Sequence, residues 1–278
     1  MAINLDLIGK ELEPIAYQYT WKDAVLYALG IGATPKDLNF VYENAKFKVY
    51  PTFAVIPAFE GLVNVVGKLK VNPMMLLHGE QKIVLHQPFP KQGKIQSIPK
   101  VEAIYDKEKA ALVVGSAKSF LEDGTHICDN IFKLYCRGEG NFGGEKGPKE
   151  EVPVPPEGKE PDFTIEYPTQ ETQALLYRLS GDYNPLHADP GIAKMGGFDK
   201  PILHGLCTYG FTGRGILEAV CDNDPAKFKS FSARFSKPVF PGEKILIKGW
   251  KLGDKQYVVE TSSERGEVVL THGVVELN

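Results

Sequence analysis

The sequence predicts an α+β protein made of two repeats, each with a helix followed by a curved antiparallel β-sheet. The first observation is a segment from Gly138 to Pro161 that is rich in glycine, proline and charge. Such a segment cannot bury apolar surface, so it predicts a solvated linker. The second is that the halves on either side share landmarks in the same order. We therefore divide the 278 residues into repeats at 1–150 and 151–278.

Two kinds of helix are predicted. Each half opens on an amphipathic stretch, at residues 21–33 and 172–182. Each half then carries an apolar residue followed by Leu-His-Gly, at residues 76–80 and 202–206. In the second half an apolar helix is expected from about Gly205 to Ala219. A helix packed on one face of a sheet buries its apolar stripe there.

Alternating apolar and polar residues predict antiparallel strands at the end of each half. Proline-bracketed turns precede these strands, near Pro90 and Pro241. The runs are KIQSIPKVEAIY, ALVVGSAKSF and HICDNIFKLYC in the first half, and KILIKGWKL, QYVVETSS and VVLTHGVVEL in the second. Four landmarks in one order favour a duplicated domain over the chance recurrence of short peptides.

Composition excludes several classes of protein. The formal net charge is −3 and there is no dense basic tract, which argues against nucleic acid as the main partner. No stretch approaches the roughly 20 apolar residues of a membrane span, and neither a signal peptide nor a C-terminal peroxisomal tripeptide is evident. The cysteines show no metal-ligand spacing, so we expect reduced core residues in a reducing compartment, at Cys128, Cys136, Cys207 and Cys221.

The strongest candidate site is the segment SGDYNPLH. Gly181 suits a helix end, and Pro185 forbids helical continuation, so a stiff turn from Asp182 to His187 is expected. Asp and His can relay a proton or bracket a water, and Asn184 can orient that water. The alternatives are a turn-capping Asp with a buried structural His, or a metal site, for which no third ligand is evident nearby. The first half reads ALGIGATPKDLNF here, so one site per chain is expected.

Two further segments carry candidate binding groups. Gly205 is expected near a helix start, where free amide hydrogens suit a developing oxyanion; tight helix packing is the alternative. His204 is expected to be structural. Arg234 and Lys237 flank a strand and could hold phosphates, although surface solvation explains them equally.

Together these segments resemble the MaoC-like hot-dog family, and closely its (3R)-specific enoyl-CoA hydratase 2 members, including the hydratase 2 domain of peroxisomal multifunctional enzymes. The residues that carry the resemblance are Tyr177, LSGD, NPLH, Ala193, GFDKPILHGLCTYGF and RFSKPVFPGE in the second half, and YALGIGA, LHGEQ and NFGG in the first. They extend over nearly the whole chain.

The resemblance implies a double hot-dog subunit that forms a homodimer and hydrates trans-2-enoyl-CoA in fatty acid β-oxidation. Asp182 and His187 would then be the acid/base pair, with Asn184 supporting them and Gly205 binding the thioester oxygen. The first repeat would lack part of its central helix and accommodate the acyl-CoA. His78, Gly79, Lys200, Arg234 and Lys237 are its candidate substrate contacts. No metal and no cofactor is expected, because the thioester already activates the double bond.

Alternative functions are a thioesterase, a dehydratase that acts on a carrier-bound acyl group, and a non-catalytic acyl-CoA binding module. Retention of Asp182 and His187 argues against simple binding, which needs neither residue. The resemblance implies a peroxisomal location; the cytoplasm or another organelle is the alternative, and the chain could be a domain of a longer protein.

Overall fold

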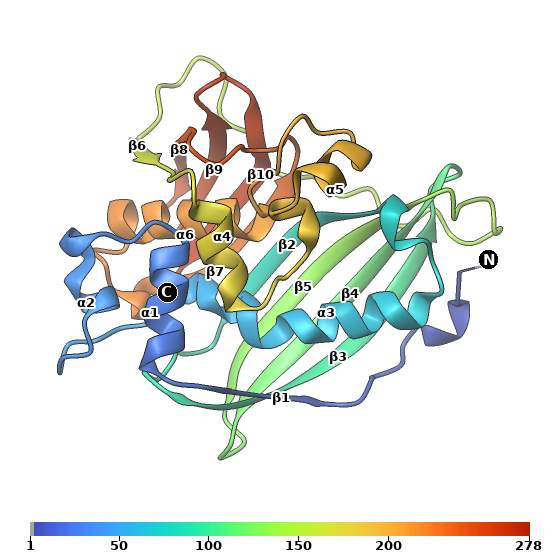
Figure 1. The fold of residues 1–278 in the computed structure, drawn as a ribbon, viewed down its shortest axis with the longest axis horizontal. Coiled ribbons are helices and arrows are strands. Elements are labelled where there is room, and N and C mark those ends of the chain that lie inside the picture. The colour runs from blue at the N-terminus through green and yellow to red at the C-terminus, as the bar shows by residue number, and fades with distance from the viewer. Residues whose placement is uncertain (1–2) are drawn as a thin grey trace.

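The structure, a computed structural model that describes residues 3–278, contains two repeats of one topology (Figure 1). Each repeat runs in the order strand, short helices, long helix and four strands. The first comprises β1 (Ile15–Tyr19), α1 (Trp21–Gly30), α2 (Leu38–Val41), α3 (Val55–Leu69), β2 (Leu76–Leu85), β3 (Gly93–Asp106), β4 (Ala110–Leu121) and β5 (His126–Arg137). The second comprises β6 (Phe163–Pro168), α4 (Gln173–Tyr177), α5 (Pro190–Met195), α6 (Gly205–Val220), β7 (Phe228–Phe235), β8 (Lys244–Gly253), β9 (Gln256–Ser263) and β10 (Val268–Leu277).

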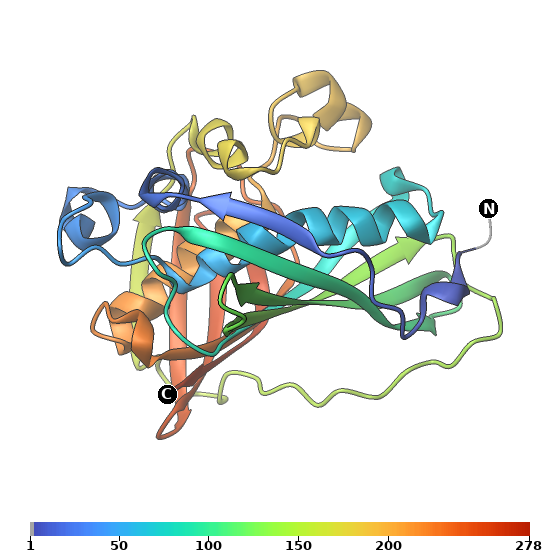
Figure 2. The ribbon, with the colours of Figure 1, turned by 90° about the horizontal axis from the view of Figure 1, so that it is seen from below.

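All ten strands form one antiparallel sheet in the order β1-β3-β4-β5-β2-β7-β10-β9-β8-β6. The repeats join where β2 pairs with β7, from Glu80 opposite Arg234 to Val84 opposite Ser230. Figure 2 shows the sheet below the helices, with α3 and α6 on the same side of it. The α+β class and the double hot-dog fold are therefore confirmed.

The predicted strands are confirmed almost to the residue, and so is the predicted helix that begins at Gly205, but one long helix was missed. The long helix of the first repeat is α3, which packs against β3 and β4 and was not predicted. It has 15 residues and α6 has 16, so the expectation of a shortened first helix is wrong. The two Leu-His-Gly segments are also not equivalent, because one opens β2 and the other leads into α6.

The predicted linker is confirmed as a segment without helix or strand between β5 and β6. Figure 2 shows it running beneath the sheet, on the side away from the helices. It is held at both ends: the Asp106 carboxylate accepts hydrogen bonds from the amides of Asn141 and Gly143, at 2.9 Å each. Near its other end, the Trp250 indole donates to the Lys159 carbonyl at 2.9 Å.

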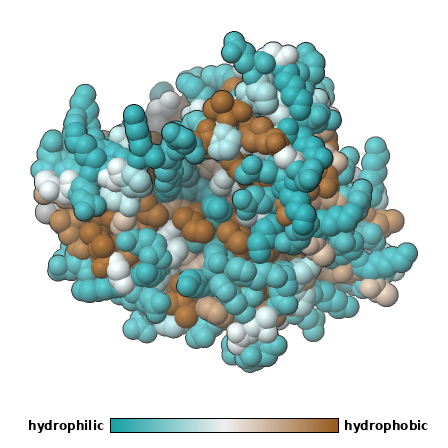
Figure 3. Space-filling model, turned by 180° about the vertical axis from the view of Figure 1, so that it is seen from behind, coloured by the Kyte–Doolittle hydropathy of each residue, from teal (hydrophilic) through white to brown (hydrophobic). Residues whose placement is uncertain are grey.

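The surface and the core agree with most expectations from composition. Figure 3, viewed from behind, shows a mainly hydrophilic face with hydrophobic side chains gathered in a band across its centre. All four cysteines are free and buried. Within the described residues, Pro51–Leu69 is the one helical stretch whose length and apolar composition would suffice to cross a membrane. It contains α3, and more than half of its most apolar window is buried inside the protein.

α6 is buried along almost its whole length and contacts both repeats. Its Arg214 is 5% exposed, donates to the Gly32 carbonyl at 2.6 Å and pairs with Asp37 at 3.1 Å. Asp37 ends the 3₁₀ turn η2 (Pro35–Asp37), which follows a capping Thr as η6 (Pro185–His187) follows a capping Asn. Asp37 therefore occupies the position in the first repeat that His187 occupies in the second, and it forms an ion pair with Arg214 of α6.

We predict that Arg214→Met lowers the free energy of unfolding by about 3–5 kcal/mol, because it leaves the Asp37 carboxylate buried without a counter-charge. Lys244→Met is the matched control, since Lys244 pairs with Glu166 at the surface, where both side chains are about half exposed. That variant should cost no more than about 1 kcal/mol. Urea unfolding of both variants measures the difference, and equal losses would contradict a structural role for the buried pair.

Candidate active site

A cavity of about 860 Å³ brings the sequence-predicted catalytic residues together. Asp182, Asn184, His187 and Gly205 all line it. Further parts of the wall come from α3, from the strands β2, β4, β5 and β10, from the end of β7 and from the linker. Most of that wall is apolar, including Phe59, Leu62, Leu76, Leu112, Val114 and Phe235. A mainly apolar cavity with a few placed polar groups is typical of a small-molecule site.

His187 is held in one tautomer by the local fold. The expected stiff turn ends in the 3₁₀ turn η6, where the Asn184 side chain accepts from the Leu186 amide at 3.0 Å. The Nδ1 of His187 lies 2.9 Å from the Ile202 carbonyl oxygen. A carbonyl can only accept, so Nδ1 carries the proton. The Nε2 lone pair of the neutral ring is then free to take a proton.

Asp182 lies beside this imidazole. It follows Gly181, whose φ of +126° ends the preceding turn as the sequence predicted. One carboxylate oxygen accepts from the Asn184 amide at 3.2 Å, which leaves the other oxygen free among the described residues. Donor atoms of Asp182, His187 and His204 all lie within 4.8 Å of one another. A single water fits between a carboxylate and an imidazole at this separation.

Burial shifts the ionisation of this pair toward neutral groups. Desolvation raises the pKa of Asp182 above its ordinary value, and the nearby His187 opposes that rise. Desolvation lowers the pKa of His187, against the opposing effects of the Ile202 hydrogen bond and of Asp182. His187 is therefore an uncharged base at neutral pH, beside a carboxyl group whose proton affinity is increased. Such a pair can pass a proton in either direction.

His204 is the residue whose position the sequence did not reveal. Its ring stacks on His187 with 3.7 Å between centroids, and its Nε2 donates to the Asp182 carbonyl at 3.1 Å. Burial lowers the pKa of His204 to about 3, so the ring stays neutral. This buried, hydrogen-bonded position agrees with the expectation of a structural histidine, and it brings the ring into contact with both Asp182 and His187. No local signal predicts this contact, which depends on the folding of residues 182–204.

Gly205 is the first residue of α6, where backbone amides have no partner within the helix. A Cβ at this position would lie 3.0 Å from the Phe235 ring, so the glycine allows the strand β7 to approach. The sequence expectations of a helix start and of tight packing are thus both met. Gly205 lines the cavity at the positive end of a 16-residue helix, which favours negative charge.

The candidate substrate contacts divide into two groups. His78, Gly79, Arg234 and Lys237 line the cavity, whereas Lys200 does not. The Lys200 ammonium instead lies over the Phe240 ring, 5.2 Å from its centroid, so the structure does not bring it to the cavity. The direction of a long, flexible side chain was not evident from its sequence position. Thr208 and Ser236 also line the cavity and were not predicted.

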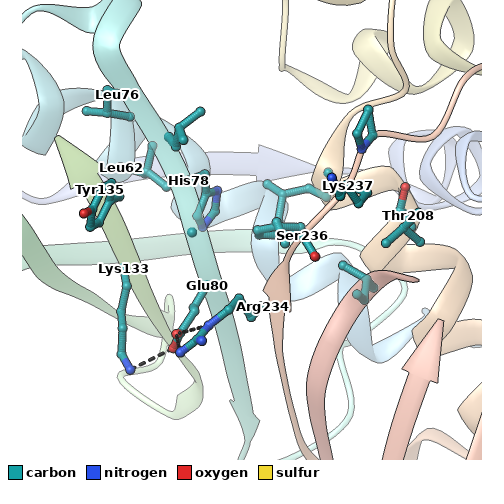
Figure 4. Close-up of a pocket in the computed structure, with 18 of the residues that line it drawn as sticks. Leu62, Leu76, His78, Glu80, Lys133, Tyr135, Thr208, Arg234, Ser236 and Lys237 are labelled. Carbon is teal, nitrogen blue, oxygen red and sulfur yellow. Dashed lines mark hydrogen bonds and ion pairs between the residues drawn. The ribbon is translucent and has the colours of Figure 1, made fainter. Parts of the chain in front are cut away.

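Charge in the cavity wall is mostly compensated. Figure 4 shows Glu80 between Lys133 and Arg234, joined to each by dashed lines. The shortest distances are 2.7 Å to Lys133 and 2.6 Å to Arg234. Lys237 forms no ion pair with any residue that the structure describes, and so remains the better candidate for an anionic group.

A metal site can now be judged on geometry. His204 supplies the third donor that the sequence lacked, since it lies with Asp182 and His187 within 4.8 Å. The two rings are stacked, however, with planes 27° apart. Lone pairs in nearly parallel rings do not converge well on one ion. The absence of a metal here therefore stays a prediction.

Comparison with known proteins places this fold and site in one family. Residues 17–138 match the family model of the MFE-2 hydratase 2 N-terminal domain, and residues 153–273 match that of the MaoC-like domain. A protein of Dictyostelium discoideum described as probable enoyl-CoA hydratase 2 is 42% identical, over 96% of this chain and 94% of that protein. The chain belongs to the enoyl-CoA hydratase 2 family of MaoC-like proteins.

Two further relatives have the same fold or domain. The peroxisomal multifunctional enzyme type 2 of Mus musculus is 40% identical over 97% of this chain, which spans only 38% of that enzyme. The crystal structure of a MaoC-like dehydratase from Phytophthora capsici superposes with a TM-score of 0.90 and 34% identity, and covers 99% of this chain and 98% of that one. Both repeats are therefore part of the shared fold.

We predict that the stability of the protein decreases as the pH is lowered, because the Nε2 of His78 is buried and the folded protein keeps this ring neutral. Burial lowers the pKa of His78 to about 4. Between about pH 6.5 and 4, the unfolded chain then binds a proton that the folded protein does not, so stability decreases by about 1.4 kcal/mol per pH unit. Urea unfolding at pH 6.5 and 5 should show His78→Phe losing about 2 kcal/mol less than the parent. Equal losses of stability in the parent and in His78→Phe would refute a neutral His78 in the folded protein.

Proposed function

We propose that this protein hydrates trans-2-enoyl-CoA to (3R)-3-hydroxyacyl-CoA in fatty acid β-oxidation. The Dictyostelium discoideum relative is named as a probable enoyl-CoA hydratase 2. The observation that carries the proposal is the convergence of three groups at one end of an apolar cavity: Asp182, His187 and the first amide of α6. Each group matches one requirement of adding water to a double bond conjugated with a thioester.

The thioester carbonyl would accept a hydrogen bond from the Gly205 amide. As water adds to C3, negative charge moves onto this oxygen, where the helix start stabilises it. The family resemblance, and not this geometry, supports the (3R) product.

Water would be held between the Asp182 carboxylate and Nε2 of His187. The pair takes one proton from the water as its oxygen bonds to C3, and returns one proton to C2. The sum is the addition of one water, with no oxidant, reductant or metal. Asn184 contributes indirectly, because its side chain caps η6 and its amide donates to Asp182.

The acyl chain would lie along the apolar wall that Phe59, Leu62 and Leu112 supply from the first repeat. This assigns to the first repeat a role in accommodating substrate without chemistry. The CoA phosphates would lie near Lys237, whose charge is not engaged by a carboxylate of the described structure. Arg234 is a weaker candidate, since Glu80 already neutralises it.

The reverse reaction, dehydration of a 3-hydroxyacyl thioester, is the second candidate, because the Phytophthora capsici relative is described as a dehydratase. The same groups serve both directions of one equilibrium. A thioesterase would instead direct water at the carbonyl carbon and release a free thiol. A binding module would retain affinity without turnover.

A homodimer and a peroxisomal location complete the proposal. The location follows the name of the Mus musculus relative, and the cytoplasm or another organelle remains the alternative. Light scattering of the purified protein tests the dimer directly.

We predict that Asp182→Asn and His187→Ala each lower kcat by ~10²–10⁴, the usual contribution of a positioned acid/base group. The assay follows loss of the conjugated absorbance of trans-2-decenoyl-CoA, and stereospecific dehydrogenases identify the product. Lys200→Ala is the matched control, because Lys200 lies outside the cavity, and it should keep parental turnover. Near-normal turnover in Asp182→Asn would sink the mechanism, and release of free CoA would favour the thioesterase.

We further predict that His204→Phe lowers kcat by ~10–10² with little change in KM, because small displacements of catalytic groups carry large costs in rate. Phenylalanine keeps the ring that stacks on His187 but cannot donate to the Asp182 carbonyl. His204→Gln can restore that donor and should recover part of the loss. A comparable fall in both variants, or an effect on KM alone, would rule out this positioning role.

A further inference from the structure

A second group of convergent polar side chains lies outside the catalytic cavity. His86, directly after β2, places its Nε2 2.9 Å from one oxygen of Asp129, and His126 places its Nε2 2.7 Å from the other. The planes of the two imidazole rings are tilted by 40°, with 4.1 Å between centroids. The cluster is remote from the proposed catalysis: His86 is eight residues along the chain from His78, or roughly 26 Å at ~3.3 Å per strand residue.

We propose that His86, His126 and Asp129 form a binding site for a divalent transition-metal ion of the Zn²⁺ type. Two imidazoles and one carboxylate are the donor set that such ions prefer over Mg²⁺ or Ca²⁺. One ligand atom from each residue lies within 4.8 Å of the others. Zn–N and Zn–O bonds of about 2.0–2.2 Å place tetrahedral ligands about 3.3–3.5 Å apart, so binding needs donor movements of the order of 1 Å.

The backbone brings these donors to one face by an irregularity in the sheet. Residues 126 and 129 are three apart on β5, and in a regular strand their side chains would point to opposite faces. The β4–β5 register shifts between Ser119 opposite Cys128 and Phe120 opposite His126, which inserts one extra residue into β5. Such bulges re-aim side chains and are common beside functional sites. Here the shift is what allows His126 and Asp129 to meet.

The site is both supported and accessible. The His86 amide donates to the Ile127 carbonyl at 2.9 Å, which ties the β2–β3 connection to β5. The Phe120 ring stacks on His126 at 4.7 Å. The three side chains are still 33%, 33% and 22% exposed, so an ion can reach them from solvent. Three protein ligands leave the fourth position for water.

The protonation state that a metal needs is also available. Each Nε2 must lose its proton to the other ring nitrogen before it can bind an ion. In the described structure, no residue hydrogen-bonds to Nδ1 of His86 or His126. The tautomer of both rings is therefore free to change. A bound ion would replace two hydrogen bonds to Asp129 with three coordinate bonds and would clamp the β2–β3 connection onto the β4–β5 hairpin.

Calorimetric titration of the metal-free, full-length protein with Zn²⁺ tests the proposal, with Mg²⁺ as the oxygen-preferring control. The parent should bind one equivalent of Zn²⁺ at this site and no Mg²⁺. His86→Gln, in an exposed connection that should not affect folding, and His126→Ala should each weaken that binding at least tenfold. His187→Ala should retain it, which separates this site from the catalytic histidines.

Thermal unfolding gives a second readout that does not depend on activity. At a free Zn²⁺ concentration of 100 times Kd, the parent Tm should rise by roughly 5–10 °C, whereas His86→Gln should show no rise. Enoyl-CoA hydration by metal-free His86→Gln should equal that of the parent. Unchanged Zn²⁺ affinity in both His86→Gln and His126→Ala, or loss of binding in His187→Ala alone, would overturn the proposal.

Discussion

The burial of α6 on all its sides is the constraint on which the site and the joint between the repeats both depend. Three glycines allow it: a Cβ at Gly210, Gly213 or Gly215 would lie 2.3–2.7 Å from a neighbouring side chain. Those neighbours come from both repeats. Because α6 packs closely against both repeats, it cannot rotate or slide without disturbing the packing of both. Its first amide is therefore presented to the cavity at a fixed point, beside a histidine whose tautomer the backbone also fixes.

Sequence patterns predicted the strands well and the long first helix poorly, for physical reasons. A two-residue period is visible wherever one sheet face is buried, as in β8 and β9. α3 reads as an ambiguous apolar run because it contains Pro57, Gly61 and Gly67. The repeated Leu-His-Gly suggested a false equivalence, since a tripeptide adopts strand or helix-capping geometry according to its surroundings.

The proximity of the residues proposed as catalytic was predictable because their geometry is local. Gly181 and Pro185 mark the ends of a short turn, and the turn alone brings Asp182 close to His187. The contacts of His204 could be seen only in the tertiary structure, because its ring stacks on His187 across the loop that joins them. Lys200 does not line the cavity, because its flexible side chain lies against an aromatic ring that is distant in sequence. Motifs thus identify groups that the backbone fixes within a few residues, and are less dependable for long side chains, since Arg234 and Lys237 line the cavity but Lys200 does not.

The pairing of β2 with β7 has a consequence for how the chain is made. Arg234 meets Glu80 across a separation of 154 residues. During synthesis the first repeat leaves the ribosome before β7 has been made, so β2 is an unpaired sheet edge until then. Unpaired edges of this kind invite association with other chains, and pairings so distant in sequence form slowly. The pairing of β2 with β7 should therefore be the folding step that determines how much the protein depends on chaperones and how much folded protein is obtained on expression.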